Sequence, residues 1–473
     1  MILLAWLGCN EPCIEGFGRD DAGDCVPLQG RGGPHPKDSS VDSEDTADTG
    51  DPATWPLGVG DPLEIISDEK YLMWEFLDSE VLDASRGVVV GQGGFGLVDL
   101  ENSTFLFEEN TERGYRLAVD GEMVFVATRT GKVYSVDLSG STPNIGQARA
   151  VGDGWNEDIA ADQGLVALAS LDSGTLLMDT QFTVLGTIPG AFAYGVGLVG
   201  DRAVVADDET VGLWDVSDPA NPVLLSSMPL RGQGRDVAFD GAQVAVALGA
   251  RGVDLFEVDG DTLMVAGELA VPGAASGVDL DGDWLWIGAW DVTALAWIGA
   301  AGPRVVGHET FHGAAMGIGA KDGVALVPAW QNLGVVRRTG DVAGPEVNAP
   351  RLLHLVQGEQ TLRLQNWGAY ELEVQLTGAG VSLSPSALTL APGEDAQVQV
   401  VAQNGGQGAV DLTTNDPDET SVQIPVSANS STLGVVHDDF TLPGFTWPDG
   451  TESPVSLSDY EGRPVFIGYW ALY

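Results

Sequence analysis

The chain has 473 residues, of which 69 are acidic and 21 are Lys or Arg, so its formal net charge at pH 7 is −48. This excess of acid leaves no basic patch to neutralise phosphates, which argues against nucleic-acid binding. The length predicts about two to four domains. With 64 glycines and many short runs of Val, Leu and Ala, the composition favours strands joined by tight turns, and we expect a mainly β protein.

The first residues resemble the end of a bacterial lipoprotein signal. Residues 1–8 are mostly apolar, and Gly8 precedes Cys9, which would carry the lipid. The apolar stretch is short and lacks a cationic start, so an unpaired thiol at Cys9 is the alternative. The resemblance implies an extracytoplasmic protein of the bacterial cell envelope, lipid-anchored or secreted, with the lipid as its only membrane contact. Cys13 and Cys25 would then remain to form a disulfide in an oxidising compartment.

Residues 9–57 hold the cysteine loop and then an acidic linker. From Gly30 to Pro56 the chain consists largely of Gly, Pro, Ser, Thr and acidic residues. Such a stretch cannot bury enough apolar area to offset the entropy lost on ordering. We therefore expect an extended, charged tether that holds the folded part away from its anchoring point.

Residues 58–340 contain a repeat of about forty residues. Short segments that end in an acid recur at spacings of 38, 42, 36 and 42 residues, and their last residues are Asp99, Asp137, Asp179, Asp215 and Glu257. Asp-Gly or Gly-Asp turns flanked by β-prone runs mark hairpins between them. A unit of this size with four strands predicts one blade of a β-propeller. We expect about seven blades, with six as the alternative, and the strand Glu64–Ile66 completing the last one.

One repeat resembles a known family. Val211–Val223 reads V-G-L-W-D-V-S-D-P-A-N-P-V, which is similar to the LVIVD repeat of bacterial and archaeal surface β-propellers. The resemblance implies a propeller that binds an unknown protein or small molecule. We expect the repeated acids to accept hydrogen bonds from adjacent turns, and a ring of such acids holding a metal is the alternative.

Residues 342–430 alternate between apolar and polar residues, as half-buried strands do. The run Leu412–Val426 contains an N-D-P turn at Asn415–Pro417. It resembles the closing hairpin of immunoglobulin-like modules of the ASPM/SPD-2/Hydin type. The resemblance implies an immunoglobulin-like β-sandwich that serves as a spacer or adhesion module.

Residues 434–473 resemble the entrance to a redoxin domain. The matching segments are D-F-T-L-P at 439–443, G-R-P-V at 462–465 and Y-W-A at 469–471. The family comprises thioredoxin-like thiol–disulfide oxidoreductases and the antioxidant peroxiredoxins of the AhpC/TSA type. The resemblance implies an incomplete thioredoxin-like α/β segment and an extracytoplasmic thiol partner, with motif residues at Asp439, Phe440, Pro443, Gly462, Pro464 and Trp470. A short terminal hairpin is the alternative.

The redoxin resemblance places the first active-site cysteine just after Tyr473, and no cysteine follows Cys25. A thiolate is the nucleophile of this chemistry, so the chain as given has no catalytic residue for it. No cofactor is implied. Whether the protein is an enzyme therefore stays open at this point.

Two further motifs resemble metal sites. His308–His312 matches H-E-x-x-H, which binds zinc only on a helix, where residues four apart share one face. Gly307 and Gly313 bracket the motif, so we expect a strand or loop and no zinc. Asp279–Asp283 resembles part of a calcium loop but lacks the later acidic ligand. We expect a blade turn there and no metal site in the chain.

Two functions are consistent with these patterns. The chain is either an exported protein of the redoxin family, with the propeller and sandwich as interaction modules, or a non-enzymatic cell-surface binding or scaffold protein that uses the propeller. No phosphate loop or nucleophile elbow is present, and five scattered histidines make a Ser/His/Asp site hard to assemble.

Overall fold

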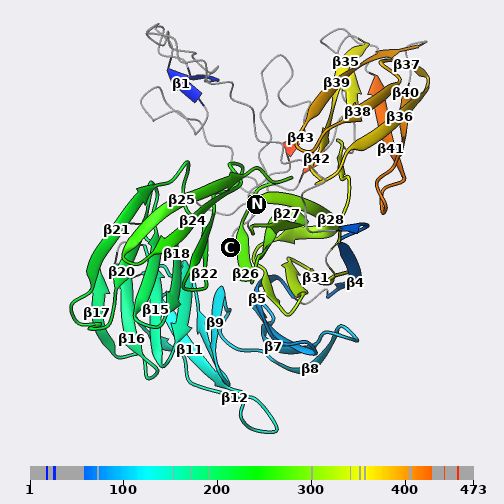
Figure 1. Cartoon of the computed structure of the whole chain (residues 1–473). Coiled ribbons are helices and arrows are strands. Elements are labelled where there is room, and N and C mark those ends of the chain that lie inside the picture. The colour runs from blue at the N-terminus through cyan, green and yellow to red at the C-terminus, as the bar shows by residue number, and fades with distance from the viewer. Residues whose placement is uncertain are drawn as a thin grey trace, which may run out of the picture. The chain divides into compact units, whose positions relative to one another are not determined.

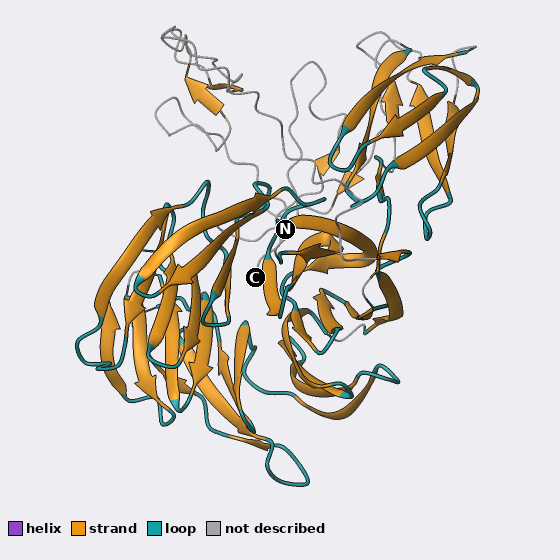
Figure 2. Ribbon diagram, viewed as in Figure 1, coloured by secondary structure: helices purple, strands orange, loops and turns teal. Residues whose placement is uncertain are grey.

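A computed structural model describes residues 17–19, 25–27, 58–428, 441–442 and 455–456, apart from 72–73, 153, 172, 191, 300–301, 341, 351–352, 356–357 and 404–406. The chain divides into two compact units, one formed by Met1–Ala47 with Ser431–Tyr473 and the other by Asp48–Ser430. Every regular element described is a strand (Figure 2), in agreement with the expected mainly β fold. A membrane-spanning helix is accordingly not found among the described residues.

The described strands between Leu63 and Arg338 form seven sheets of three to five strands, which we call blades 1 to 7 in the order of their innermost strands. Blade 1 comprises β5 (Phe76–Asp83), β6 (Arg86–Gly91), β7 (Gly94–Asp99) and β8 (Thr104–Glu109). Blade 2 comprises β9 (Arg116–Asp120), β10 (Met123–Ala127), β11 (Lys132–Asp137), β12 (Asn144–Ile145) and β13 (Arg149–Ala150). Blade 3 comprises β14 (Asp158–Asp162), β15 (Leu165–Ser170), β16 (Gly174–Asp179) and β17 (Val184–Ile188).

Blades 4 to 7 follow the same plan. Blade 4 comprises β18 (Gly195–Val199), β19 (Arg202–Ala206), β20 (Thr210–Asp215) and β21 (Val223–Pro229), and blade 5 comprises β22 (Asp236–Phe239), β23 (Gln243–Ala247), β24 (Val253–Asp259) and β25 (Thr262–Leu269). Blade 6 comprises β26 (Gly277–Asp281), β27 (Trp284–Trp297) and β28 (Arg304–Ala315). Blade 7 comprises β29 (Gly319–Lys321), β30 (Val324–Ala329), β31 (Asn332–Arg338) and β4 (Leu63–Lys70).

The innermost strands contact one another in the order β5, β9, β14, β18, β22, β26 and β29, and β29 contacts β5 again. The blades therefore form a closed ring, which Figure 1 shows, and this arrangement is a β-propeller, a fold whose blades surround a central channel. The last blade is completed by β4, which pairs antiparallel with β31. This confirms the expected role of Glu64–Ile66, which lies within β4.

Short apolar runs and glycine turns explain the blades. The second strands are almost wholly buried, as in β10, where Val124–Ala127 expose none of their surface. These runs are rich in Val and Ala, which fill the narrow space between facing sheets. The turns from first to second strand place Gly121, Gly200 and Gly241 at positive φ, a conformation that glycine adopts without steric cost.

Four of the five repeated acids accept hydrogen bonds from the turns that follow them, as expected, whereas the fifth, Glu257, lies inside β24 and does not end it. Asp99 accepts bonds from the backbone N–H groups of Glu101 (2.9 Å) and Asn102 (3.2 Å). Asp137, Asp179 and Asp215 accept equivalent bonds from the second residue after each of them, all at 2.9 Å. These acids are used for turn structure.

Residues 342–428 form a two-sheet module. Its first sheet comprises β33 (Val347–Asn348), β35 (Glu359–Asn366), β39 (Asp395–Ala402) and β37 (Val381–Ser384); its second comprises β34 (Leu353–Leu355), β41 (Ser421–Ala428), β40 (Gln407–Thr414), β36 (Leu372–Ala379) and β38 (Ala387–Leu390). One apolar core takes residues from both sheets, including Leu362, Leu376 and Ile424. The N-D-P turn joins β40 to β41, as the alternating pattern suggested, and β32 (Val342–Ala343) pairs with β3 (Gly58–Val59) before the module begins.

Most residues singled out for the signal and redoxin resemblances lie outside the described part of the chain. These are Cys9, Cys13, Asp439, Phe440, Pro443, Gly462, Pro464 and Trp470. Cys25 begins β2 (Cys25–Pro27), which pairs with β1 (Phe17–Arg19). Within the other motif, β42 (Thr441–Leu442) pairs with β43 (Val455–Ser456). The lipid, disulfide and redoxin assignments stay predictions.

Candidate functional site

Carboxylates of the central channel, buried in Asp78 and Asp158 and half-buried in Asp236 and Asp279, fasten four of the seven blades to the next one. They lie near the start of the innermost strands, and each accepts a hydrogen bond from a backbone N–H of the following blade. The pairs are Asp78 with Leu117 (2.8 Å), Asp158 with Val196 (2.7 Å), Asp236 with Val278 (2.8 Å) and Asp279 with Ala320 (2.6 Å). Hydrogen bonds to a charged acceptor are about twice as strong as neutral ones, so these bonds stabilise the ring.

A second layer of carboxylates does the same at the other end of the innermost strands. Its acceptors bind the turn glycines of the next blade: Asp120 with Gly164 (2.7 Å), Asp162 with Gly200 (2.6 Å) and Asp281 with Gly323 (2.7 Å). The Asp279–Asp283 segment is therefore the expected blade turn, and two of its acids are used between blades.

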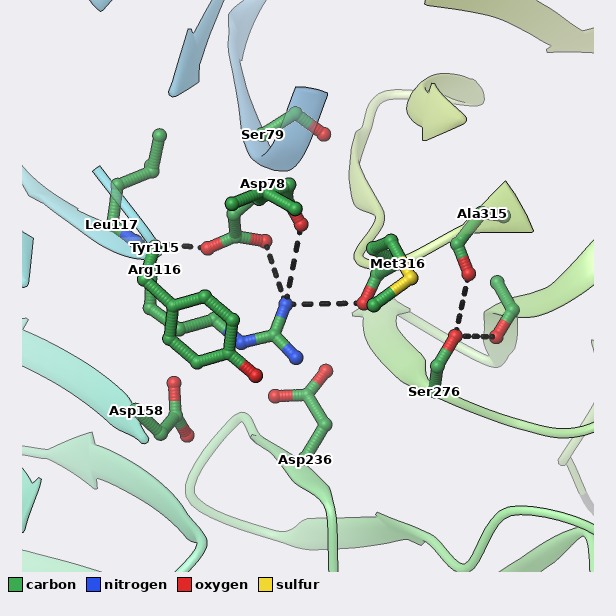
Figure 3. Close-up of polar contacts among 12 residues, drawn as sticks. Asp78, Ser79, Tyr115, Arg116, Leu117, Asp158, Asp236, Ser276, Ala315 and Met316 are labelled. Carbon is green, nitrogen blue, oxygen red and sulfur yellow. Dashed lines mark hydrogen bonds and ion pairs between the residues drawn. The ribbon is translucent and has the colours of Figure 1, made fainter. Parts of the chain in front are cut away.

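Arg116 occupies in blade 2 the channel position that acids occupy in other blades. Its side chain is 6% exposed, and its Nη1 donates to the backbone oxygen of Met316 (3.1 Å) and lies 3.5 Å from Asp78 Oδ1. Figure 3 shows the guanidinium among the carboxylates of Asp78, Asp158 and Asp236. Burial alone would lower the pKa of Arg116, but these carboxylates outweigh it and raise the pKa.

Burial raises the pKa of the channel acids because it disfavours their charged forms. The pKa of Asp78 is raised to about 7, although Arg116 acts in the opposite direction. Burial likewise raises the pKa of Asp279 to about 7, against two backbone hydrogen bonds that lower it. Asp158 and Glu80 have pKa values well above their usual range, through burial and then the neighbouring acids. The channel mouth therefore contains carboxyls that titrate near neutral pH.

The serine hydroxyl groups beside the channel acids donate hydrogen bonds to backbone carbonyl oxygens. Ser276 Oγ donates to the carbonyl oxygens of Ala315 (2.6 Å) and Gly288 (3.1 Å), as Figure 3 shows in part, and Ser79 Oγ donates to that of Leu326 (2.8 Å). A catalytic serine needs its proton directed at a base. The described channel therefore offers buried acids and one arginine, without an activated hydroxyl next to them.

Aromatic side chains lie in loops and strands of several blades, and three of them are exposed. Trp155 (46% exposed) and Phe192 (44%) lie in the loops that lead into blades 3 and 4, and Trp290 (54%) lies opposite Ala315 in blade 6. Trp330 forms a bridge to Phe76, two residues before Asp78. We call Trp155, Phe192, Trp290 and Trp330 the aromatic rim.

Three rim residues have a backbone conformation that bulky side chains rarely adopt. Phe192, Trp290 and Trp330 have φ values of 65°, 61° and 62°. Such outliers cost about 1–3 kcal/mol each and are concentrated at functional sites. Beside Trp330 lies an open recess of about 410 Å³, which is also lined by Lys70 and Asn332.

An arginine holds the remaining rim residue in place. The guanidinium carbon of Arg129 lies 4.1 Å from the ring centroid of Tyr115 and 5.2 Å from that of Trp155. Its Nη2 also donates to Tyr115 Oη (2.8 Å) and Glu157 Oε2 (3.1 Å). Cation–π contacts and a half-buried ion pair therefore fix Trp155 while leaving its outer face exposed.

The H-E-x-x-H segment is part of strand β28, as expected from its flanking glycines. Residues four apart on a strand are separated by about 13 Å, which is too far for two histidines to bind one zinc. His308 pairs across the sheet with Ala294. The segment therefore lacks the geometry of a zinc protease.

Sequence reasoning did not find the channel acids or the aromatic rim. A signal existed for the acids, because Asp158-Ile159-Ala160 and Asp236-Val237-Ala238 share the pattern Asp, β-branched residue, Ala at the same place in two blades. With 69 acids in the chain, this pattern did not stand out. The rim residues have no common motif, since they lie in loops of different lengths.

No family model and no curated protein matches the sequence. Among solved structures, the chain is similar to the Cps50 (Swd1) β-propeller domain of Myceliophteria thermophila, with 12% identity and a TM-score of 0.49 over 59% of this chain and 100% of that one. It is also similar to the WD40 β-propeller domain of Doa1 (12%, 0.49, 59% and 97%) and to U3-55K (10%, 0.48, 59% and 99%). The description of the fold rests on the strand pairing and the ring of contacts given above.

Proposed function

We propose that this chain is a non-enzymatic binding or scaffold protein whose aromatic rim contacts a protein partner. The observation that carries the proposal is the exposure of Trp155, Phe192 and Trp290, two of them at positive φ. Buried aromatic anchors dominate the energetics of protein interfaces, and Trp is enriched among them. The channel acids are occupied in joining blades, which leaves the rim as the working surface.

The proposal is tested with paired substitutions on the full chain. Trp155→Ala with Trp290→Ala removes two rim side chains, whereas Leu106→Ala with Val265→Ala removes two equally exposed apolar side chains from outer strands. Each purified variant is cross-linked to envelope proteins of the source organism, and the captured proteins are quantified. We expect one partner to be captured at least about tenfold less by the rim pair, since a lost hot spot costs 2 kcal/mol or more. Equal capture by both pairs would contradict the proposal.

We further propose that the propeller is an LVIVD-type ring of an exported protein, lipid-anchored at Cys9 or secreted. An immunoglobulin-like spacer would follow it, and Cys13 and Cys25 would form a disulfide. The signal-like residues 1–8 and the acidic linker support this arrangement. Mass spectrometry of the mature protein tests it, because a lipid adds a defined mass to Cys9 and Cys9→Ser releases the protein from membranes. An unmodified, cytosolic protein would contradict it.

A second proposed function is thiol–disulfide exchange in a longer product of the same gene. The combination of D-F-T-L-P at 439–443 with G-R-P-V at 462–465 favours it. The reading frame after codon 473 tests it: continuation into a cysteine motif supports a redoxin, whereas an immediate stop contradicts it. The chain as given should not catalyse the reduction of insulin by dithiothreitol, because no cysteine follows Cys25.

A further inference from the structure

A buried aspartate in the turn between β40 and β41 has an oxygen without a donor. Asp416 is 0% exposed, and its Oδ2 accepts a hydrogen bond from the backbone N–H of Val347 (2.7 Å). Its Oδ1 is buried and accepts no hydrogen bond from an N–H or hydroxyl group of the described residues, although the Asp418 carboxyl lies within hydrogen-bonding reach of the Asp416 side chain. A buried carboxylate oxygen without a donor is costly, so it calls for an explanation such as a missing ion.

Two more carboxylates converge on this one. One oxygen from each of Glu346, Asp416 and Glu419 lies within 4.8 Å of the other two. Glu346 is 2% exposed and its backbone is fixed, because its carbonyl oxygen accepts a bond from Trp367 N (2.9 Å). Its Oε1 lies 3.1 Å from His308 Nδ1 of strand β28. We call Glu346, Asp416 and Glu419 the turn triad.

A second group of acids lies beside the turn triad. Asp61, Glu309 and Asp418 also have oxygens within 4.8 Å of one another, and Asp418 follows Asp416 by two residues. Burial and then the neighbouring carboxyls raise the pKa of Asp416 to about 9 and that of Glu309 to about 8. The same causes raise the pKa of Glu346. His308 contacts Glu346 of the triad, and the two groups together hold six carboxyl side chains.

The donor set indicates which ion would fit. Carboxylate oxygens alone suit the hard cations Ca²⁺ and Mg²⁺, whereas zinc prefers nitrogen or sulfur ligands. Calcium binds oxygens at about 2.4 Å, so oxygens on opposite sides of the ion are about 4.8 Å apart. Magnesium needs about 2.1 Å and near-ideal octahedral geometry, which three side chains from separate segments do not impose.

We propose that the turn triad of Glu346, Asp416 and Glu419 binds a calcium ion. The ion would supply Asp416 Oδ1 with its missing partner and would neutralise carboxylates that otherwise repel one another. Because Glu346 also contacts His308, and Glu309 belongs to the adjacent acidic group, the ion would fix the junction between the two-sheet module and strand β28. This site is independent of the proposed rim function.

The test compares thermal unfolding of the full chain, first stripped with EDTA, in calcium chloride and in magnesium chloride at equal ionic strength. We expect calcium at saturating concentration to raise the melting temperature of the wild-type protein by about 5 °C, since a ligand that binds only the folded state stabilises it. Calcium titration followed by calorimetry should show a saturable site that Asp416→Asn weakens by about tenfold or more.

Asp416→Asn also separates ligand binding from a purely structural role. Its side-chain oxygen can still accept from Val347 N, and it removes a repelled charge, so without calcium the variant should melt at or above the wild-type temperature. Glu419→Gln is a second, partly exposed variant that should also lose the calcium response. Glu359→Gln, an exposed acid of the same module, should keep it. A wild-type protein without a calcium-specific shift, or an unchanged shift in Asp416→Asn, would overturn the proposal.

Discussion

The channel acids and the turn triad bury the same chemical group in two different ways. In the channel, Asp279 has a backbone donor for each oxygen, Leu280 N at 2.8 Å and Ala320 N at 2.6 Å. In the turn, Asp416 has a donor for one oxygen and none for the other among the described residues. Burial alone therefore does not distinguish a structural acid from a candidate ligand-binding one; the supply of donors does.

The channel acids and the turn triad also differ in the basic residue that lies beside them. Arg116 lies among the channel carboxylates, whereas in the turn triad His308 lies against Glu346. A fixed cation lets the channel keep charged acids without a bound ion. The following predictions test this contrast, beginning with the largest expected effect.

Arg116→Met should destabilise the protein most, because it leaves buried carboxylates without their cation. Removing one partner of a buried ion pair costs about 3–5 kcal/mol. We expect this loss in urea unfolding at pH 8 and a smaller loss at pH 5, where Asp78 and Asp279 are protonated. Arg363→Met, which breaks an exposed ion pair with Asp395, is the control and should cost less than about 1 kcal/mol. Similar losses for both variants would remove the contrast.

The stability of the wild-type propeller should fall as the pH rises. The pKa values of Asp78 and Asp279 are about 7 in the folded protein, well above the ordinary aspartate value of 3.8. Between pH 3.8 and 7 the folded state therefore binds more protons than the unfolded state. The contribution of these two groups to the free energy of unfolding is complete below pH 3.8 and is lost as the pH rises through 7. We expect a decrease on the order of 5 kcal/mol between pH 5 and 8 in urea titrations, since each of the two groups contributes about 1.4 kcal/mol per pH unit below its folded pKa. A flat profile would contradict the raised pKa values, and Asp279→Asn should flatten part of the curve.

Gly317→Ala should disturb the channel directly. A Cβ at this position would lie 2.3 Å from Asp78 Oδ1 and 3.0 Å from Arg116 Nη1. Overpacking of this kind costs about 1–3 kcal/mol. Gly190→Ala is the control, because a Cβ there meets no atom within 4 Å. Equal melting temperatures for the two variants would show that the ion pair can move without cost.

Asp99→Ala should have the smallest effect. Its carboxylate is fully exposed and serves one turn, where hydrogen bonds from Asn102 and Glu101 lower its pKa. We expect the melting temperature to fall by about one degree. A loss as large as that of Arg116→Met would mean that turn acids matter as much as channel acids.

The repeat explains why the blades could be predicted from the sequence. The acids that end the third strands and the Asp-Gly turns recur at regular spacing because each blade has the same local hydrogen bonds. Asp137 accepts its bond two residues away, and such short-range geometry leaves a visible motif. The strand Glu64–Ile66 was identifiable because the last sheet would otherwise lack a strand.

The contacts between distant segments could not be predicted in this way. Asp78 and Met316 meet at Arg116 although they are 238 residues apart, and nothing local in either segment indicates the other. Glu309 belonged to a motif that was rejected for zinc, and Asp416 to a motif interpreted as a turn. The strand and the turn were found as expected, yet neither indicated that both residues would lie in one acidic junction.

The pairing of β4 with β31 also has a consequence for biosynthesis. Leu63 leaves the ribosome long before Arg338, its partner in that ladder, so the ring cannot be completed until the whole repeat region has been translated. Until then β4 and the open edge of the newest sheet have unpaired backbone groups, which are prone to aggregation. The nascent chain should therefore depend on chaperones over this interval, and its many acids would help by keeping neighbouring chains apart.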